Sequence, residues 1–392
     1  MLTKIKRHRL FLLLLKTIFT VIGIFPKDKK LMMFESFHGK QYSDSPRAIY
    51  EYMNKKYPSY KLVWSVDKSS VKLFESYNVP YIRRLTLKWL FTMPRAQYWI
   101  NNVRLPKWMP KPRGTVYLQT WHGTPLKKLG LDIEEVYMPG TTTNTYRNNI
   151  INESNNWTYL ISPNNYSSEV FKRAFQFNGE IIESGYPRND ILYNAELSQV
   201  QKIKEKVGIP VNKKVILYAP TWRDDDFYKV GQYKFTFQFE LEKMKERFGD
   251  DFVLLTRMHY LVAESFDFTV YGDFIKDVSS YPDIADLYLI SDLLITDYSS
   301  VFFDYANLKR PIIFFMYDLD DYRDRLRGFY FDIEKDAPGP IVKTEDELYY
   351  AIEHASKSGH VSHESFEKFY NRFCYLEDGK ATERVVKRLL ER

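Results

Sequence analysis

The sequence predicts an α/β protein with two domains, each built on a parallel, doubly wound sheet. Short apolar segments alternate with longer amphipathic segments, which is the pattern of repeated βα units. The alternation restarts after about residue 192, and 392 residues with 44% hydrophobic content are enough for two cores. We therefore expect a segment over residues 1–30, a first domain over 31–192, a second domain over 193–345 and C-terminal helices over 346–392.

The elements of the first domain follow from short apolar runs bounded by turn residues and from apolar residues at helical spacing. Strands are expected over residues 31–36, 60–66, 98–103, 115–120, 159–162 and 180–184, and helices over 45–56, 85–94 and 167–175. Residues 141–156 are rich in Thr and Asn, so we expect them to form a mobile loop.

A polar helix is expected over residues 195–207, at the boundary of the second domain. Strands are expected over 214–219, 252–257, 274–277, 293–296 and 311–316, the last of the sheet, and helices over 239–248, 284–290 and 301–308. The tail from Thr344 is expected to be helical and charged. Because strands alternate with helices, both sheets are expected to be parallel.

The charge and the cysteine content indicate which partners and which cellular compartment suit the chain. The chain has a formal charge of +7, which favours anionic partners such as acidic lipids or phosphorylated substrates. No run of Lys and Arg interleaved with aromatic residues resembles a nucleic-acid module, so we expect no nucleic-acid partner. Cys374 is the single cysteine, which excludes an internal disulfide and a multi-cysteine metal site and fits a reducing, cytoplasmic compartment.

Residues 1–30 differ from the rest of the chain. Basic residues precede the apolar run 10–15, Lys16 interrupts it, and residues 17–25 are again apolar before three further lysines. The pattern lacks the cleavage site of a secretory signal and is short of a clean membrane-spanning helix. We expect an amphipathic helix resting on an anionic membrane surface, with a helix packed on the first domain as the alternative.

The stretch from Leu293 to Asp304 predicts an anion site. An apolar strand ends at polar turn residues, and Ser299 or Ser300 is placed to cap the next helix. Free backbone N–H groups, two hydroxyls and the positive end of the helix dipole would bind a phosphate. Asp304 lies one turn beyond Ser300, near any sugar attached to that phosphate. The alternative is a serine-capped helix that binds no nucleotide.

His122 directly follows the expected strand 115–120. A histidine at the carboxyl end of a parallel strand lies in the ligand crevice of such a sheet and can act as a general base near neutral pH. Gly123 permits a close backbone approach, while Thr124 and Pro125 suit the start of a helix. The alternative is a structural histidine that satisfies a turn.

Arg257 and His259 lie at the end of the apolar strand 252–255 and together suit a phosphate or pyrophosphate. The two histidines have no carboxylates at metal-ligand spacing, so we expect no metal. The acidic run 224–226 is expected to be a solvated loop rather than a magnesium site.

Two further motifs also follow strands. Arg188 and Arg223 are candidate anion ligands, and Pro220 and Thr221 form a turn that shapes the backbone. Because all these groups lie at carboxyl ends of strands, two facing sheets would place His122 on one wall of a cleft. The opposite wall would carry Arg257, His259, Ser299, Ser300 and Asp304, an arrangement that suits a nucleotide diphosphate donor.

Five motifs together resemble the CDP-glycerol glycerophosphotransferase family of wall teichoic acid synthesis in Gram-positive bacteria. In chain order they are Trp121-His-Gly-Thr-Pro-Leu-Lys-Lys, Tyr186-Pro-Arg-Asn-Asp, Tyr218-Ala-Pro-Thr-Trp-Arg, Arg257-Met-His and Thr296-Asp-Tyr-Ser-Ser-Val-Phe-Phe-Asp. The resemblance spans about residues 30–380. The run Phe34-Glu-Ser-Phe-His-Gly-Lys-Gln-Tyr-Ser-Asp also resembles the shorter members, the glycerophosphate primases.

The resemblance implies a GT-B-type fold, in which two Rossmann-like domains with parallel sheets face an interdomain cleft. It also implies peripheral attachment to the cytoplasmic face of the membrane. The implied reaction requires no metal or cofactor. His122 and His259 are the implied catalytic residues. The implied CDP-glycerol-binding residues are His122, Gly123, Thr124, Pro125, Leu126, Arg188, Pro220, Thr221, Arg257, Met258, His259, Ser299, Ser300 and Asp304.

The expected reaction is transfer of glycerol phosphate from CDP-glycerol to an undecaprenyl-diphosphate-linked acceptor, with release of CMP. His122 would deprotonate the acceptor hydroxyl, and Arg257 and His259 would stabilise the pyrophosphate. Three alternatives remain: a CDP-ribitol ribitolphosphotransferase, a GT-B glycosyltransferase that releases a nucleoside diphosphate, and a membrane-tethered binding or scaffold protein. The sequence leaves open whether one unit or many are added.

Overall fold

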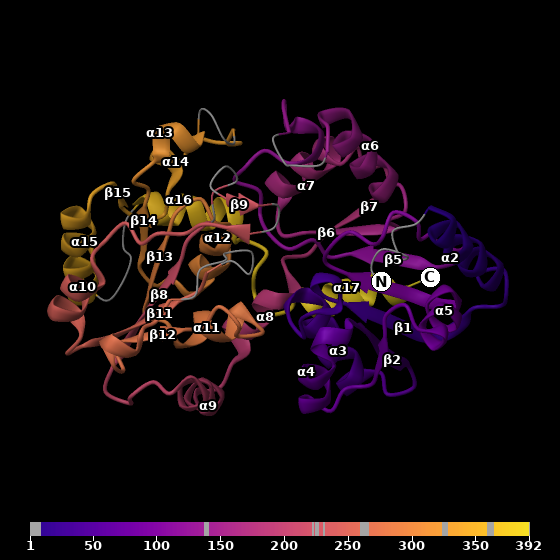
Figure 1. Ribbon diagram of the computed structural model, residues 1–392, viewed down its shortest axis with the longest axis horizontal. Coiled ribbons are helices and arrows are strands. Elements are labelled where there is room, and N and C mark those ends of the chain that lie inside the picture. Colours follow the sequence, from indigo (N-terminus) through magenta and orange to yellow (C-terminus); the bar gives the residue numbers. More distant parts are fainter. Residues whose placement is uncertain are drawn as a thin grey trace. The chain divides into compact units, whose positions relative to one another are not determined.

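Two compact units make up the protein (Figure 1). The computed structural model describes residues 9–136, 141–221, 223, 227–229, 232–258, 266–323, 328–358 and 364–391. Of these, unit 1 comprises residues up to 122, then 147–190, and the C-terminal residues from 379. Unit 2 comprises the segment from 123 to 146 and the residues from 191 to 378.

Unit 1 is organised around a seven-stranded sheet in the order β3-β2-β1-β4-β5-β6-β7, and every neighbouring pair is parallel. Strands β1, β4 and β5 are buried for most of their length, because helices cover a doubly wound sheet on both faces. The strands are β1 (Asp28–Glu35), β2 (Lys61–Val66), β3 (Tyr81–Arg83), β4 (Ala96–Asn101), β5 (Val116–Gln119), β6 (Tyr159–Ser162) and β7 (Glu180–Glu183).

The C-terminal helix α17 completes the core of unit 1. Figure 1 shows this yellow helix among the earlier elements of the unit, and it packs against α3. Val385, Val386 and Leu389 join the buried cluster of the sheet. The Asp190 carboxylate accepts hydrogen bonds from the backbone N–H groups of Ala381 and Thr382 at 2.9 and 2.8 Å, which caps the helix.

The helices of the first half of the chain include those predicted over residues 45–56, 85–94 and 167–175, and two short helices over 71–76 and 190–194 that the sequence did not predict. They are α2 (Arg9–Ile22), α3 (Asp44–Lys56), α4 (Val71–Ser76), α5 (Leu87–Thr92), α6 (Thr143–Ser154), α7 (Asn165–Ala174) and α8 (Asp190–Asn194), with α17 (Ala381–Leu390) at the end of the chain. Short 3₁₀ segments are η1 (Phe37–Gly39), η2 (Lys68–Ser70), η3 (Met93–Arg95), η4 (Gly130–Asp132) and η5 (Pro187–Asn189).

The prediction of a mobile loop over residues 141–156 is wrong, because α6 occupies Thr143–Ser154. The Thr142 hydroxyl accepts a hydrogen bond from the N–H of Thr145 at the start of this helix. Near its end, Ile150 is buried and the Ser154 hydroxyl donates to the Phe175 carbonyl at 2.7 Å. These tertiary contacts stabilise a helix whose composition is that of a loop.

Unit 2 has a six-stranded parallel sheet in the order β12-β11-β8-β13-β14-β15. Its strands are β8 (Lys214–Ala219), β11 (Phe252–Thr256), β12 (Ile275–Asp277), β13 (Leu293–Thr296), β14 (Ile312–Phe315) and β15 (Ile341–Val342). The prediction that 311–316 is the last strand is wrong, because β15 pairs with β14 at the edge. A two-residue strand carries too short a pattern to recognise. An antiparallel hairpin, β9 (Phe227–Lys229) and β10 (Gln232–Tyr233), lies outside this sheet.

Helices α10 and α15 contribute to one large core cluster with alternate residues of the strands, including Ile216, Leu254 and Ile295. Helices α11 and α12 pack against β8 and β13. The helices of unit 2 are α9 (Leu197–Val207), α10 (Leu241–Phe248), α11 (Ile284–Ile290), α12 (Val301–Tyr305), α13 (Leu319–Asp321), α14 (Ile333–Asp336), α15 (Glu345–Ser358) and α16 (Glu364–Phe373), with η6 (Thr269–Tyr271) and η7 (Ala306–Leu308).

Both sheets have the Rossmann strand order 3-2-1-4-5-6 when their strands are numbered within each unit, and unit 1 adds a seventh strand. The predicted α/β class with two parallel Rossmann-like sheets is therefore confirmed. The order reverses between β1 and β4 in unit 1 and between β8 and β13 in unit 2. Ligands of such sheets bind outside the carboxyl ends of the strands at these switch points, so a ligand is expected at the loops that follow these four strands.

Helix α2 has one buried and one exposed apolar face. Phe19 is fully buried, and its ring lies 5.8–6.1 Å from the rings of Trp89, Trp99 and Trp108. On the opposite face, Leu10, Leu13, Leu14 and Val21 are 52–68% exposed. Among the described residues, no helix has both the length and the apolar character needed to cross a bilayer.

Candidate active site

His122 lies at the carboxyl edge of the unit 1 sheet, three residues after the end of β5. Trp121 has a positive φ of 52° and stacks on the imidazole at a centroid distance of 4.5 Å. The Phe37 ring lies 6.1 Å away on the loop after β1. Much of the ring therefore faces aromatic carbon, although the residue keeps an exposed surface.

A backbone carbonyl determines the tautomer of His122. Nδ1 lies 2.7 Å from the Asn102 carbonyl oxygen, which can only accept a hydrogen bond. Nδ1 therefore carries the proton, and the Nε2 lone pair is available as a base. Desolvation by the surrounding protein lowers the pKa of His122, and Arg188 and Arg104 act in the same direction. The Asn102 carbonyl and the Asp44 charge partly oppose that shift.

Asn102 is a neighbour of His122 that the sequence prediction missed. Its side-chain oxygen accepts a hydrogen bond from the Phe37 N–H at 2.9 Å, and its amide nitrogen lies 3.3 Å from the Ser36 hydroxyl. One residue thus connects the loops after β1, β4 and β5. A usable signal was the polar pair Asn101-Asn102 at the end of an apolar strand, which the prediction included in the strand itself.

The loop after β1 has an unusual backbone. Phe37, His38 and Gly39 have consecutive positive φ values of 45°, 62° and 77°. Such conformations are costly for residues with a side chain and cluster at functional sites. At Gly39 a Cβ would lie 2.6 Å from the Ser65 carbonyl oxygen, so glycine is required there. The loop lies at the switch point of unit 1.

Arg188 lies in unit 1, where a carboxylate already binds it. Its Nη1 lies 3.3 and 3.5 Å from the two Asp44 carboxylate oxygens, and both side chains are less than 10% exposed. The guanidinium also lies 4.1 Å from the centre of the Tyr186 ring. Asp44 has a positive φ of 64°. The predicted anion ligand is therefore half of a buried ion pair, and Asp44 was not predicted.

The segment that follows His122 belongs to unit 2 and approaches Ser300 there. A Cβ on Gly123 would lie 2.7 Å from the Ser300 hydroxyl oxygen, so the backbone passes directly over that side chain. Thr124, Pro125 and Leu126 are buried. No helix starts at Thr124, contrary to the prediction. The Leu126 carbonyl accepts from the Tyr330 N–H and Lys127 forms a bridge with Phe329, so the backbone hydrogen bonds run to a neighbouring segment.

Pro220 and Thr221 follow β8 and face the loop after β13, across the switch point of unit 2. The Asp297 carboxylate accepts a hydrogen bond from the Thr221 N–H at 2.8 Å. The Thr221 hydroxyl is buried and has no hydrogen-bond partner in the described chain. A buried polar atom without a partner points to an absent ligand or water.

Ser299 and Ser300 are half-buried at the start of α12. Ser300 occupies the N-cap position, but its hydroxyl makes no capping hydrogen bond, so that part of the prediction is wrong. The helix is also only five residues long, which leaves little dipole. Asp304 is 6% exposed in the same helix. Its role at a sugar stays a prediction.

Arg257 and Met258 directly follow β11 at the same edge of the sheet. Arg257 Nη1 donates to the carbonyls of Val278 and Tyr281 at 3.0 and 2.8 Å, and Met258 N–H donates to the Ser279 hydroxyl. Burial lowers the pKa of Arg257. These contacts orient the guanidinium from one side. His259 and residues 224–226 lie outside the described residues.

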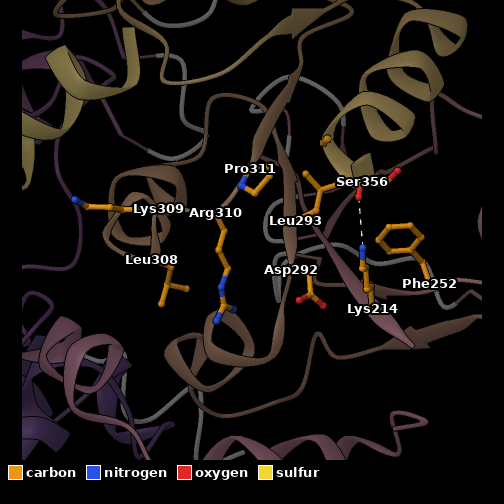
Figure 2. Close-up of a pocket in the computed structure, with 10 residues that line it drawn as sticks. Lys214, Phe252, Asp292, Leu293, Leu308, Lys309, Arg310, Pro311 and Ser356 are labelled. Atoms are coloured by element: carbon orange, nitrogen blue, oxygen red, sulfur yellow. Dashed lines mark hydrogen bonds between the residues drawn. The ribbon is translucent and has the colours of Figure 1, made fainter. Parts of the chain in front are cut away.

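A separate hollow in unit 2 lies at the opposite, amino-terminal edge of the sheet (Figure 2). It has a volume of about 310 Å³ and is lined by residues such as Lys214, Phe252 and Leu293, each the first or an early residue of its strand. None of the predicted site residues lines it. Parallel sheets bind ligands at the other edge, so we do not place the active site here. In the described parts of the chain no three His, Cys, Asp or Glu residues cluster as a metal site would require.

Known proteins resemble this chain in sequence and in structure. The family model described as "CDP-Glycerol:Poly(glycerophosphate) glycerophosphotransferase" matches residues 17–391. A teichoic acid poly(glycerol phosphate) polymerase of Bacillus subtilis (strain 168) is 55% identical over 97% of this chain, which spans about half (51%) of that relative. The polymerase of the same name from Bacillus spizizenii is 52% identical, with 98% of each chain covered.

A solved structure is similar over nearly the whole chain. It is a variant of the wall teichoic acid polymerase TagF soaked with CDPG, and it is 41% identical with a TM-score of 0.85. The match covers 96% of this chain and 95% of the other.

Proposed function

Because the chain belongs to the CDP-glycerol:poly(glycerophosphate) glycerophosphotransferase family, we propose that it transfers glycerol phosphate from CDP-glycerol to a lipid-linked teichoic acid acceptor. The acceptor is an undecaprenyl-diphosphate-linked saccharide or its glycerol phosphate extension, and CMP is the second product. The observation that carries the proposal is the geometry of His122, whose Nδ1 donates to Asn102 and whose Nε2 is left as a base.

In the proposed reaction, Nε2 of His122 takes the proton of the acceptor hydroxyl. The resulting oxygen forms a bond to the β-phosphorus of CDP-glycerol, and the bond from that phosphorus to the bridging oxygen breaks. CMP leaves with the bridging oxygen and its electron pair. A neutral imidazole is required for the first step, and the lowered pKa of His122 keeps it neutral at physiological pH.

Donor binding is proposed for the groups at the switch point of unit 2. Thr221, Ser299 and Ser300 offer hydroxyls, and the backbone of Gly123 passes over Ser300. Arg257 supplies positive charge on the same edge. His259 keeps its proposed role beside the pyrophosphate, and Pro220, Met258 and Asp304 keep theirs as donor-binding residues. Arg188 lies in unit 1 and is paired with Asp44, so its donor-binding role stays a prediction. Most of the rate gain would come from positioning and electrostatics.

The test is to incubate the protein separately with CDP-glycerol and CDP-ribitol, using a lipid-linked acceptor, and to analyse the product by mass. We expect glycerol phosphate units on the acceptor and stoichiometric CMP, as the names of both Bacillus relatives suggest. A ribitol phosphate product would select the ribitol alternative. Release of a nucleoside diphosphate would select a glycosyltransferase, and binding without turnover would leave a scaffold. The number of units added is read from the same spectrum.

Membrane attachment through α2 is the second part of the proposal. Its exposed leucines repeat at helical spacing, Arg9, Lys16, Lys29 and Lys30 are exposed around them, and Ile24 and Phe25 extend the apolar surface beyond the helix. The neighbouring helix α5 adds exposed Leu87 and Phe91. An apolar face flanked by cations suits an anionic leaflet on the cytoplasmic side, where the lipid-linked acceptor is reached.

Vesicle co-sedimentation tests this attachment. Replacing Leu10, Leu13 and Leu14 by Gln removes about 1.5–3 kcal/mol of burial for each side chain that enters the membrane, so binding to anionic vesicles should fall at least tenfold. Leu197→Gln, an 83% exposed leucine in unit 2, is the matched control and should bind as wild type. Unchanged binding of the triple variant would contradict attachment through α2.

A further inference from the structure

Arg223 was predicted to be an anion ligand, but in the structure carboxylates surround it. Its Nη1 donates to Asp297 at 2.9 Å, and its Nε and Nη2 make a fork to the two oxygens of Asp318 at 2.7 and 2.9 Å. The guanidinium is also 5.0–5.3 Å from the ring centres of Tyr298, Tyr317 and Tyr322. Because these carboxylates occupy most of the guanidinium N–H donors, few of them can bind a phosphate.

The contacts of Arg223 join three loops that leave neighbouring parallel strands. Its own loop follows β8, and Nη1 donates to the Thr221 carbonyl there at 2.6 Å. Asp297 opens the loop after β13, and Asp318 lies in the loop after β14, where the Tyr317 hydroxyl also accepts from Nη2. The same Asp297 carboxylate accepts the Thr221 N–H. Arg223 therefore spans the switch point of unit 2.

The aromatic side chains extend this connection to the segment after His122. Tyr298 stacks on Tyr322 at 4.0 Å and donates a hydrogen bond to Asp318 at 3.0 Å. Phe329 lies 5.7 Å from Tyr298 and forms a backbone bridge with Lys127. Burial opposes the charge of Arg223, but the carboxylates of Asp297 and Asp318 outweigh it and raise its pKa.

We propose that Arg223 is a positioning residue for the donor site: with Asp297 and Asp318 it fixes the loops that present Thr221 and Ser299–Ser300 to the donor's phosphates. It touches no donor atom in this role. The inference rests on the proposed function for its kinetic consequence, but its structural consequence can be measured without any donor. A planar fork is required because lysine carries one ammonium group and cannot bind two carboxylates and a carbonyl in this geometry.

Arg310 offers a matched control in the same unit. Its Nη1 donates to the carbonyls of Tyr288, Leu289 and Ser291 at 2.6–3.2 Å, so it is also a structural arginine. It lies just before β14, at the amino-terminal edge of the sheet, where it lines the hollow of Figure 2. Loss of a buried arginine contact is therefore common to both variants, and loss of loop positioning is specific to Arg223.

The experiment compares Arg223→Lys with Arg310→Lys by amide hydrogen exchange and by steady-state kinetics of the full chain. We expect Arg223→Lys to speed exchange at least tenfold in peptides covering residues 219–221 and 297–300 and to raise KM for CDP-glycerol at least tenfold, with a smaller change in kcat. Arg310→Lys should leave both within twofold. Asp318→Asn, which keeps the size of the side chain, should move both readouts in the same direction by a smaller factor.

Wild-type exchange in these peptides of Arg223→Lys would overturn the inference, as would equal effects in Arg310→Lys. A raised KM with unchanged exchange would also overturn it, because Arg223 would then act on the donor directly. If wild type turns over no CDP-glycerol, the proposed function fails, and the exchange comparison alone decides the inference. Should Arg223→Lys fail to fold, Asp318→Asn provides the same comparison.

Discussion

The two sheets have the same strand order, but different residues connect the loops at their carboxyl edges. In unit 1 the loops at the edge are connected through Asn102, and His122 keeps an available nitrogen. In unit 2 the loops are connected through Arg223 and the carboxylates of Asp297 and Asp318. The hydroxyls of Thr221, Ser299 and Ser300 take no part in this connection. The fold provides the place for a site, whereas the residues that join the loops decide what that site can do.

The difference suits the two roles in the proposed transfer, a base in unit 1 and donor binding in unit 2. A base must keep a lone pair and a neutral charge, which a backbone carbonyl and an aromatic surrounding favour for His122. A donor site must hold hydroxyl and backbone groups in place. Side chains that form ion pairs with one another can do this without competing for the phosphates. Substitutions at the two edges should therefore affect different steps of the reaction.

Replacing His122 by Ala removes the proposed base and should lower kcat about 10²–10⁴-fold, while binding of CDP-glycerol changes by only a few fold. Turnover by CMP release and binding by calorimetry measure the two quantities. His354→Ala, an exposed histidine on α15, is the control and should behave as wild type. A variant of His122 that retains wild-type turnover would remove the base from unit 1 and end the division of labour.

Replacing Asp44 by Asn removes the carboxylate from the buried Arg188 guanidinium of unit 1. Asn also tolerates the positive φ of this position, so the charge is the main loss. We expect the free energy of unfolding to fall by about 3 kcal/mol, because one member of a buried ion pair remains. Urea denaturation measures this. Lys172→Gln, which removes an exposed ion pair with Glu169, should cost less than about 1 kcal/mol.

Replacing Gly123 by Ala tests the approach of its backbone to Ser300. A Cβ placed 2.7 Å from the hydroxyl oxygen forces one of them to move, so KM for CDP-glycerol should rise about tenfold with kcat less affected. The double variant with Ser300→Gly removes the clash, and the effect of the alanine should then be smaller than in the wild-type background. Strict additivity would show that the clash is not the cause.

The motifs and the fold could be predicted because their signals are local. Apolar strands ending in His122, Thr221 or Ser300 are visible in a few consecutive residues, and a parallel sheet necessarily gathers such ends on one edge. The same reasoning gave most of the strands that compose the two sheets. It failed at β15 and at α6, where pairing with a neighbour or a buried face decides the structure rather than the segment itself.

The partners of the site residues could not be predicted, because they come from far away in the chain. Asp44 meets Arg188 across 144 residues, and Arg223 meets Asp318 across 95. Nothing near Arg188 or Arg223 indicates whether the guanidinium will face a phosphate or a carboxylate. The sequence therefore identified the edge and its residue types, and only the fold distinguishes the groups that could touch a substrate from those that hold the loops.

The pH profile gives the smallest effect. Desolvation lowers the pKa of His122 below its ordinary value of 6.5, so the neutral form persists to more acidic pH than in a free histidine. The acid limb of kcat/KM should then lie below pH 6.5. Because the Asp44 charge raises this pKa, Asp44→Asn should shift the limb further down. An upward shift would contradict the electrostatics of unit 1, and Arg223→Lys should leave the limb in place.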